Sequence, residues 1–66
     1  MKAEFIVSDM TCNHCVQTIT RAVQTAAPGA RVQVDLDARR VSVEAAVEAA
    51  ALQAAIAEEG YDVRLA

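Results

Sequence analysis

The sequence predicts an α+β fold in which four strands form one antiparallel sheet and two helices cover one of its faces. Two observations support this fold class. Apolar and polar residues alternate in four short segments, and apolar residues recur every three or four positions in the two longer segments between them. The chain has 66 residues, the size of one small domain, so we expect residues 1–66 to form a single domain.

The first strand and the first helix are predicted from the beginning of the chain. In residues 2–7 every second residue (Ala3, Phe5 and Val7) is apolar, so one side of this segment is apolar, as expected of a half-buried strand. Residues 13–27 carry apolar side chains at steps of three and four, which indicates an amphipathic helix. Pro28 and Gly29 then end this helix.

The remaining elements follow in the same way. Residues 32–36 and 41–45 alternate again, and the short polar segment between them predicts a hairpin. Residues 46–59 are mostly strong helix formers, and Gly60 stands where a left-handed cap is expected. Residues 61–65 alternate once more. The order β-α-β-β-α-β is the ferredoxin-like, or split βαβ, motif, in which right-handed crossovers place both helices on one face.

Composition excludes several classes of function. The net charge is −3 and the aromatic residues are one Phe and one Tyr, so binding of nucleic acid through phosphates or base stacking is not expected. No apolar run approaches the ~20 residues of a membrane span, and the start of the chain lacks the pattern of a signal peptide. We therefore expect a cytoplasmic protein without membrane insertion. The sequence shows no pair of carboxylates placed for general acid–base catalysis and no nucleophile–His–Asp set, so an enzyme is not expected.

The two cysteines, Cys12 and Cys15, are the candidate metal ligands. They stand three residues apart where the loop after the first predicted strand enters the first helix, so both sulfurs can converge on one point. The partial positive charge of a helix N-terminus favours thiolates, the form that binds metals. Two thiolates suit a soft ion of low coordination number such as Cu(I), whereas a structural zinc site needs four ligands.

The same spacing leaves alternatives open. A carrier of Hg(II), Zn(II) or Cd(II) is one, because mercury also accepts two thiolates. A thiol–disulfide oxidoreductase is another, since redox motifs share the Cys-x-x-Cys spacing. The chain is short for a thioredoxin-like enzyme, however, and neither Trp nor Pro flanks the cysteines. A structural disulfide would close only a short segment and stabilise little.

The segment Met10-Thr11-Cys12-Asn13-His14-Cys15, in a chain of this length and element order, resembles the heavy-metal-associated domain family and its small bacterial copper chaperones. The segment Gly60-Tyr61-Asp62-Val63 after the second helix also recurs in that family. The resemblance implies Cu(I) bound by both cysteines and passed by thiolate exchange to the metal-binding domain of a copper-transporting P-type ATPase. Copper can also bridge two such loops, so a homodimer is considered as well.

Neighbours of the cysteines are assigned lesser roles. Met10 carries a thioether, but a Met at this position is more often a plug that packs under the loop. His14 is expected to face a partner or to act on the ligands rather than bind the metal directly. Asn13 and Thr11 lie in the same loop. By resemblance, zinc-handling relatives have an acid where this chain has Thr11, which favours copper.

Two further positions come from the resemblance. Tyr61 is expected beside the site, where its ring shields copper and its hydroxyl reaches a sulfur. Asp9 replaces the usual Gly before the Met and brings a carboxylate near the metal loop, which would oppose thiolate formation or change metal preference. The Met1 start and the end soon after the last strand favour a freestanding protein over a module of a transporter.

Overall fold

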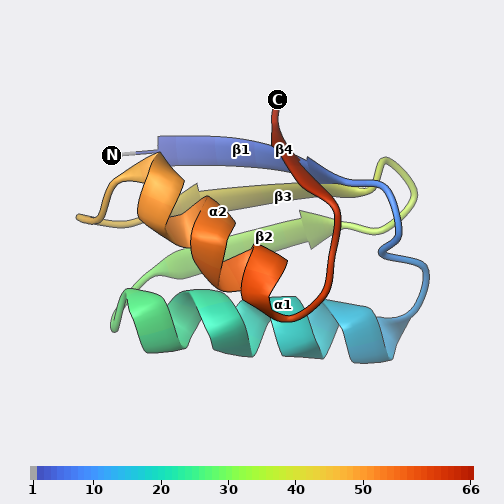
Figure 1. Cartoon of the computed structure of the whole chain (residues 1–66), viewed down its shortest axis with the longest axis horizontal. Coiled ribbons are helices and arrows are strands. Elements are labelled where there is room, and N and C mark those ends of the chain that lie inside the picture. The colour runs from blue at the N-terminus through green and yellow to red at the C-terminus, as the bar shows by residue number, and fades with distance from the viewer. Residues whose placement is uncertain (1) are drawn as a thin grey trace.

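The structure is a computed structural model that describes residues 2–66. Its six elements follow the predicted order (Figure 1): β1 (Lys2–Val7), α1 (Asn13–Ala26), β2 (Arg31–Asp35), β3 (Arg40–Glu44), α2 (Ala49–Glu58) and β4 (Val63–Leu65). The four strands form one sheet in the order β2-β3-β1-β4, and every neighbouring pair is antiparallel. The predicted ferredoxin-like architecture is therefore confirmed.

The two faces of the sheet differ as strand alternation requires. Phe5 of β1 lies opposite Val41 of β3 on the face covered by the helices, and both side chains are fully buried. On the other face Glu4 and Arg40 form an exposed ion pair at 3.6 Å, and Ser42 Oγ donates a hydrogen bond to Glu4 Oε1 at 3.2 Å. Because β1 is a central strand, paired with both β3 and β4, the loop at its C-terminal end leaves from the interior of the sheet.

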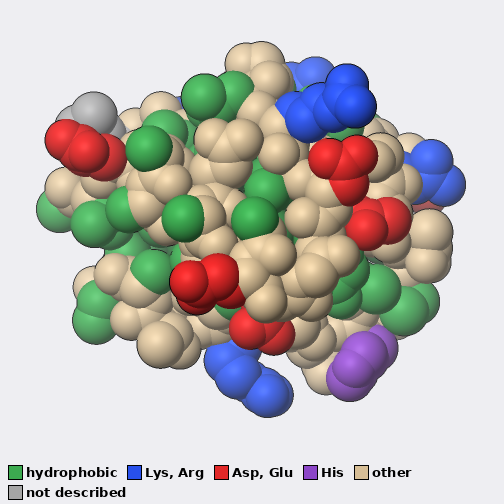
Figure 2. All heavy atoms as spheres, in the orientation of Figure 1, with side chains coloured by type: hydrophobic (Ala, Val, Ile, Leu, Met, Phe, Trp, Pro, Cys, Tyr) green, Lys and Arg blue, Asp and Glu red, His purple; other side chains and the backbone are tan. Residues whose placement is uncertain are grey.

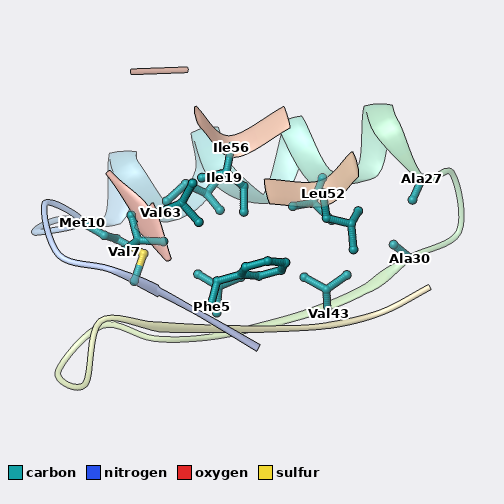
Figure 3. Close-up of a cluster of buried hydrophobic side chains, with 12 residues drawn as sticks. Phe5, Val7, Met10, Ile19, Ala27, Ala30, Val43, Leu52, Ile56 and Val63 are labelled. Carbon is teal, nitrogen blue, oxygen red and sulfur yellow. The ribbon is translucent and has the colours of Figure 1, made fainter. Parts of the chain in front are cut away.

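The core is a single layer of apolar side chains between helices and sheet. Figure 3 shows the helices on one side of this layer, the strands on the other, and Phe5 between them. The buried residues are Phe5, Val7, Met10, Ile19, Val23, Ala27, Ala30, Val41, Val43, Leu52, Ile56 and Val63. Met10 belongs to no helix or strand, yet it is 0% exposed, so the loop before α1 is anchored in the core.

The second helix is shorter than predicted at both ends. The helix predicted from residue 46 begins only at Ala49, since Glu48 is still extended, with φ −67° and ψ 149°. Glu59, the last residue of the predicted helix, is its exposed C-cap. Gly60 has φ +94°, as its predicted capping position requires.

The last strand is also shorter than predicted. It begins at Val63, which pairs with Val7, so Tyr61 lies before the strand and not within it. The N–H of Asp62 is directed to the side chain of Asp9 and not to a neighbouring strand. Residues 60–62 therefore form a connection that passes close to the loop after β1, at the end of the sheet where α1 begins (Figure 1).

The hairpin between β2 and β3 contains a strained residue. Arg39 has φ +55°, the only positive φ of a non-glycine residue among residues 2–66. Because glycine adopts this conformation without a Cβ clash, we expect Arg39→Gly to raise the free energy of unfolding by about 0.5–1 kcal/mol. Thermal unfolding measures the change. The matched control, Ala38→Gly, lies at a negative φ and should lower stability; an Arg39→Gly variant that is also less stable would contradict the strain.

Candidate metal centre

The two cysteine sulfurs lie together at the start of α1. Cys12 is the N-cap of the helix and Cys15 lies in its first turn. Their Sγ atoms are 3.5 Å apart and share a hydrogen bond in which either sulfur can be the donor. Both cysteines are free thiols; Cys12 is exposed and Cys15 is half-buried. The pair is thus close enough to act on one ion and open on the Cys12 side.

The backbone around the pair explains this arrangement. After β1 ends, the N–H of Met10 donates to the carbonyl of Val7 at 3.1 Å, which turns the chain toward the helix. Cys12 is extended, with φ −151° and ψ 168°, and its carbonyl accepts the N–H of Val16 at 3.2 Å, which closes the first helical turn. The side chain of Cys12 forms no capping bond to the helix, so its sulfur is available to a ligand.

Hydrogen bonds favour the thiolate of Cys15. The largest effect comes from the Tyr61 hydroxyl, followed by a backbone hydrogen bond at Thr11 and the side chain of Cys12, and together they lower the pKa of Cys15 to about 7. The same contact with Cys15, with partial burial, raises the pKa of Tyr61 to about 12. A neutral hydroxyl thus donates to a sulfur that is about half ionised at neutral pH.

The other predicted neighbours take different positions. Met10 is packed in the core. Thr11, Asn13 and His14 are exposed on the loop and the first residues of α1. Figure 2 shows the one histidine side chain on the surface, at the end where α1 begins in Figure 1.

The potential ligand set is small. Among residues 2–66 no group of three or more His, Cys, Asp or Glu side chains is arranged to hold a metal ion. What the structure offers a metal at this end of the molecule is therefore a pair of sulfurs.

One site residue escaped the sequence reasoning. The hydroxyl of Thr18 donates to the carbonyl of His14 at 3.0 Å, and the side chain of Thr18 also acts on the Tyr61 hydroxyl, whose pKa it lowers. It stands three residues after Cys15, a spacing that places both on the same side of the helix. The sequence contains this spacing, but the spacing alone does not indicate that Thr18 lies near Tyr61.

The pKa of Cys15 gives a testable pH dependence. We expect the rate of alkylation of Cys15 to fall as the pH decreases through about 7, because the thiolate is the nucleophile. The sign for stability follows from the lowered pKa: the contribution of these hydrogen bonds is complete above the ordinary thiol value of 9.0 and is lost as the pH falls through about 7. Alkylation by iodoacetamide with site-resolved mass spectrometry measures the profile.

Tyr61→Phe tests the cause of that shift. Since the hydroxyl of Tyr61 is the largest influence on the pKa of Cys15, the variant should move the alkylation profile toward that of the urea-unfolded chain. Identical profiles for the variant and the wild type would mean that the hydroxyl does not act on this sulfur.

Comparison with known proteins points in one direction. Residues 4–62 match the model of the heavy-metal-associated domain. Copper chaperone CopZ of Enterococcus hirae is 40% identical over 68 residues, which cover 98% of this chain and 99% of CopZ. Copper-transporting ATPase 1 of Rhizobium meliloti is 37% identical over 65 residues, 96% of this chain but only 8% of the ATPase.

A solved structure shows the same fold. It is described as a gold binding protein and superimposes with a TM-score of 0.92 at 31% identity, over 97% of this chain and 98% of that one.

Within residues 2–66, neither helix has the length and apolar character needed to cross a bilayer.

Proposed function

The chain belongs to the heavy-metal-associated domain family, and on that premise we propose that it is a cytoplasmic metal chaperone whose cargo is Cu(I), with residues 1–66 as one domain. The observation that carries the proposal is the sulfur pair: Cys12 and Cys15, 3.5 Å apart, exposed on one side and placed at a helix N-terminus. Similarity to a copper chaperone and to part of a copper-transporting ATPase supports copper as the cargo.

The chemistry of the donors favours Cu(I) over harder ions. Thiolates are soft ligands and suit Cu(I), whereas Zn(II) in a structural site takes four ligands. The described residues provide two sulfurs without a cluster of three potential ligands around them. Two thiolates outweigh the charge of a monovalent ion and leave the complex with a net negative charge, so the site needs no further anionic ligand.

Exposure of Cys12 supports transfer by ligand exchange. A thiolate of the partner attacks the bound ion from the open side and forms a third copper–sulfur bond. One bond to this chain then breaks, and a second partner thiolate replaces the remaining one. Over each of the two exchanges one copper–sulfur bond forms and one breaks, so copper stays monovalent and is never released to water. No bond of a substrate is cleaved, and the protein acts as a carrier and not as an enzyme.

The partner we propose is the metal-binding domain of a copper-transporting P-type ATPase. The similarity of this chain to a segment of such an ATPase supports it, because a donor and an acceptor with the same pair of thiolates exchange copper with little change in free energy. The relative affinities of the two domains and removal of copper by the pump then set the direction of transfer.

A transfer experiment tests this function. The chain is loaded with one equivalent of Cu(I) and mixed with an acceptor domain of the same family that has its own Cys-x-x-Cys pair. We expect transfer at a rate proportional to acceptor concentration and much faster than spontaneous release into a chelator. An acceptor with both cysteines replaced by Ser is the control. A rate that is independent of the acceptor and equal to spontaneous release would refute ligand exchange.

A second soft ion remains a specific alternative as cargo. The fold and 31% identity shared with a gold binding protein favour a carrier of Au(I), Hg(II) or another thiophilic ion. Competition titrations of the reduced chain with Cu(I), Au(I), Hg(II), Zn(II) and Cd(II) separate these cases. If copper is the cargo, the reduced chain should have its highest affinity for Cu(I) when competing thiols are present at intracellular concentrations. A clear preference for another ion would change the proposed cargo but not the proposed ligands.

A further inference from the structure

The carboxylate of Asp9 joins the metal loop to the segment that carries Tyr61. The N–H of Asp62 donates to both oxygens of Asp9, at 3.1 and 3.3 Å. Ser8 Oγ adds a longer hydrogen bond to Asp62 Oδ2, at 3.5 Å. These contacts connect residues that are 53 or 54 positions apart in the chain, and the proposed transfer chemistry does not use them.

We propose that Asp9 is a positioning residue that fastens residues 60–62 to the metal loop and so keeps the Tyr61 hydroxyl on the sulfur of Cys15. The inference rests on the proposed function, because it concerns how the two sulfurs of the metal centre are made unequal. The Asp9 side chain acts through residues 60–62 and is a ligand neither of the cargo nor of a sulfur.

The position of the hydrogen bond in the sheet explains why a side chain is needed. β1 and β4 pair as far as Val7 and Val63, which ends the ladder on this side. Asp62 stands one residue before that last pair and Asp9 stands two residues after it. The Asp9 carboxylate thus accepts the N–H that a longer β1 would have paired, and a charged acceptor makes this a strong hydrogen bond.

We call the hydrogen bond from the N–H of Asp62 to the carboxylate of Asp9 the clamp. Both of its residues are fixed by their neighbours in the chain. Asp9 precedes Met10, whose side chain is fully buried and whose N–H is bonded to Val7. Asp62 precedes Val63, the first residue of β4. Tyr61 immediately precedes Asp62 and follows Gly60, which has a positive φ. Holding Asp62 therefore limits the backbone freedom of Tyr61 beside Cys15.

The consequence is an asymmetric pair of ligands. Cys15 is half-buried and hydrogen bonded by Tyr61, while Cys12 is exposed. A partner thiolate then meets the ion from the side of Cys12, and Cys15 is the sulfur that holds the ion longer. Loss of the clamp lets Tyr61 move away from Cys15, so that its side chain no longer covers the Cys15 sulfur. The residence time of the ion then becomes shorter.

A different role for Asp9 would be its charge alone, which would act on the thiolates without fixing Tyr61. Two substitutions separate the roles. Asp9→Asn removes the charge and keeps an oxygen that accepts the N–H of Asp62, whereas Asp9→Ala removes both. Asp37→Ala, in the exposed connection between β2 and β3, is the matched control for loss of one carboxylate.

The test has one spectroscopic readout and one kinetic readout. Tyr61 is the only Tyr and the chain has no Trp, so tyrosine fluorescence of the reduced, metal-free protein reports on Tyr61 alone. We expect Asp9→Ala to move this emission toward that of Tyr in the unfolded chain, Asp9→Asn to move it less because a neutral oxygen still accepts the N–H, and Asp37→Ala to retain the wild-type signal. Release of Cu(I) to a chelator should be about two- to tenfold faster in Asp9→Ala, the effect of one hydrogen bond.

A double variant completes the test. In a Tyr61→Phe background Asp9→Ala should change the release rate no further, because the clamp acts through the hydroxyl. Unchanged Tyr61 emission in Asp9→Ala, equal effects of Asp9→Asn and Asp9→Ala, or additive effects in the double variant would each overturn the proposal. A wild-type chain that fails to bind Cu(I) would refute the proposed function instead, and the fluorescence of the metal-free variants would still decide the role of Asp9.

Discussion

Replacing Cys12 or Cys15 by Ser is expected to lower the affinity for Cu(I) by more than about 100-fold. Changes around a metal site that leave its ligands intact already cost about 10–100-fold, and here one of two ligands is lost. A Ser hydroxyl is a hard donor and stays protonated at neutral pH, so it replaces neither the charge nor the softness of a thiolate. Titration of the reduced protein against a Cu(I) chelator measures the affinity.

The Cys series needs a control on the same helix. Gln17→Ser alters an exposed side chain of α1 two residues after Cys15 and should keep the wild-type affinity. The double Cys12→Ser, Cys15→Ser variant should bind no copper in the presence of the chelator. A Cys12→Ser variant with wild-type affinity would contradict binding of Cu(I) by the two sulfurs, since the proposed binding and the proposed transfer both require Cys12 and Cys15.

The second large effect concerns stability and distinguishes a core residue from a ligand. Met10 is 0% exposed in the core, so Met10→Ala should lower the free energy of unfolding by about 2–5 kcal/mol through lost burial and a cavity. Met10→Leu nearly conserves volume and should cost less than about 1.5 kcal/mol. Urea denaturation of the metal-free protein measures both values.

The same pair of variants tests the role of the Met10 sulfur. Since the thioether is packed under the loop and not exposed to solvent, Met10→Leu should retain the Cu(I) affinity of the wild type. A folded Met10→Leu variant with an affinity as low as that of Cys12→Ser would identify the thioether as a ligand and would contradict its placement in the core.

Local patterns were sufficient for most of the fold. The alternation in β1 and the apolar spacing in α1 follow from burial of one face, and Gly60 was placed as a cap because its conformation is a local property. The predicted start of α2 was wrong by three residues, since Ala46, Glu48 and Ala49 favour helix and helix propensity does not show where the chain is still crossing from β3.

The site was predictable only in part for a related reason. The spacing of Cys12 and Cys15 is local, so it indicated two converging sulfurs, and their separation of 3.5 Å agrees with that geometry. The place of Tyr61 came from family resemblance and not from periodicity, which wrongly extended β4 to include it. The contact between Asp9 and Asp62 spans most of the chain, and no spacing rule pairs residues so far apart.

Native mass spectrometry of the reduced protein with one equivalent of Cu(I) tests the central claim most directly. We expect the wild-type chain to gain the mass of one copper ion per chain, or of copper shared between two chains, and the variant lacking both cysteines to gain none. A wild-type chain that stays metal-free, or a double variant that takes up copper equally well, would contradict a metal centre built on these two sulfurs.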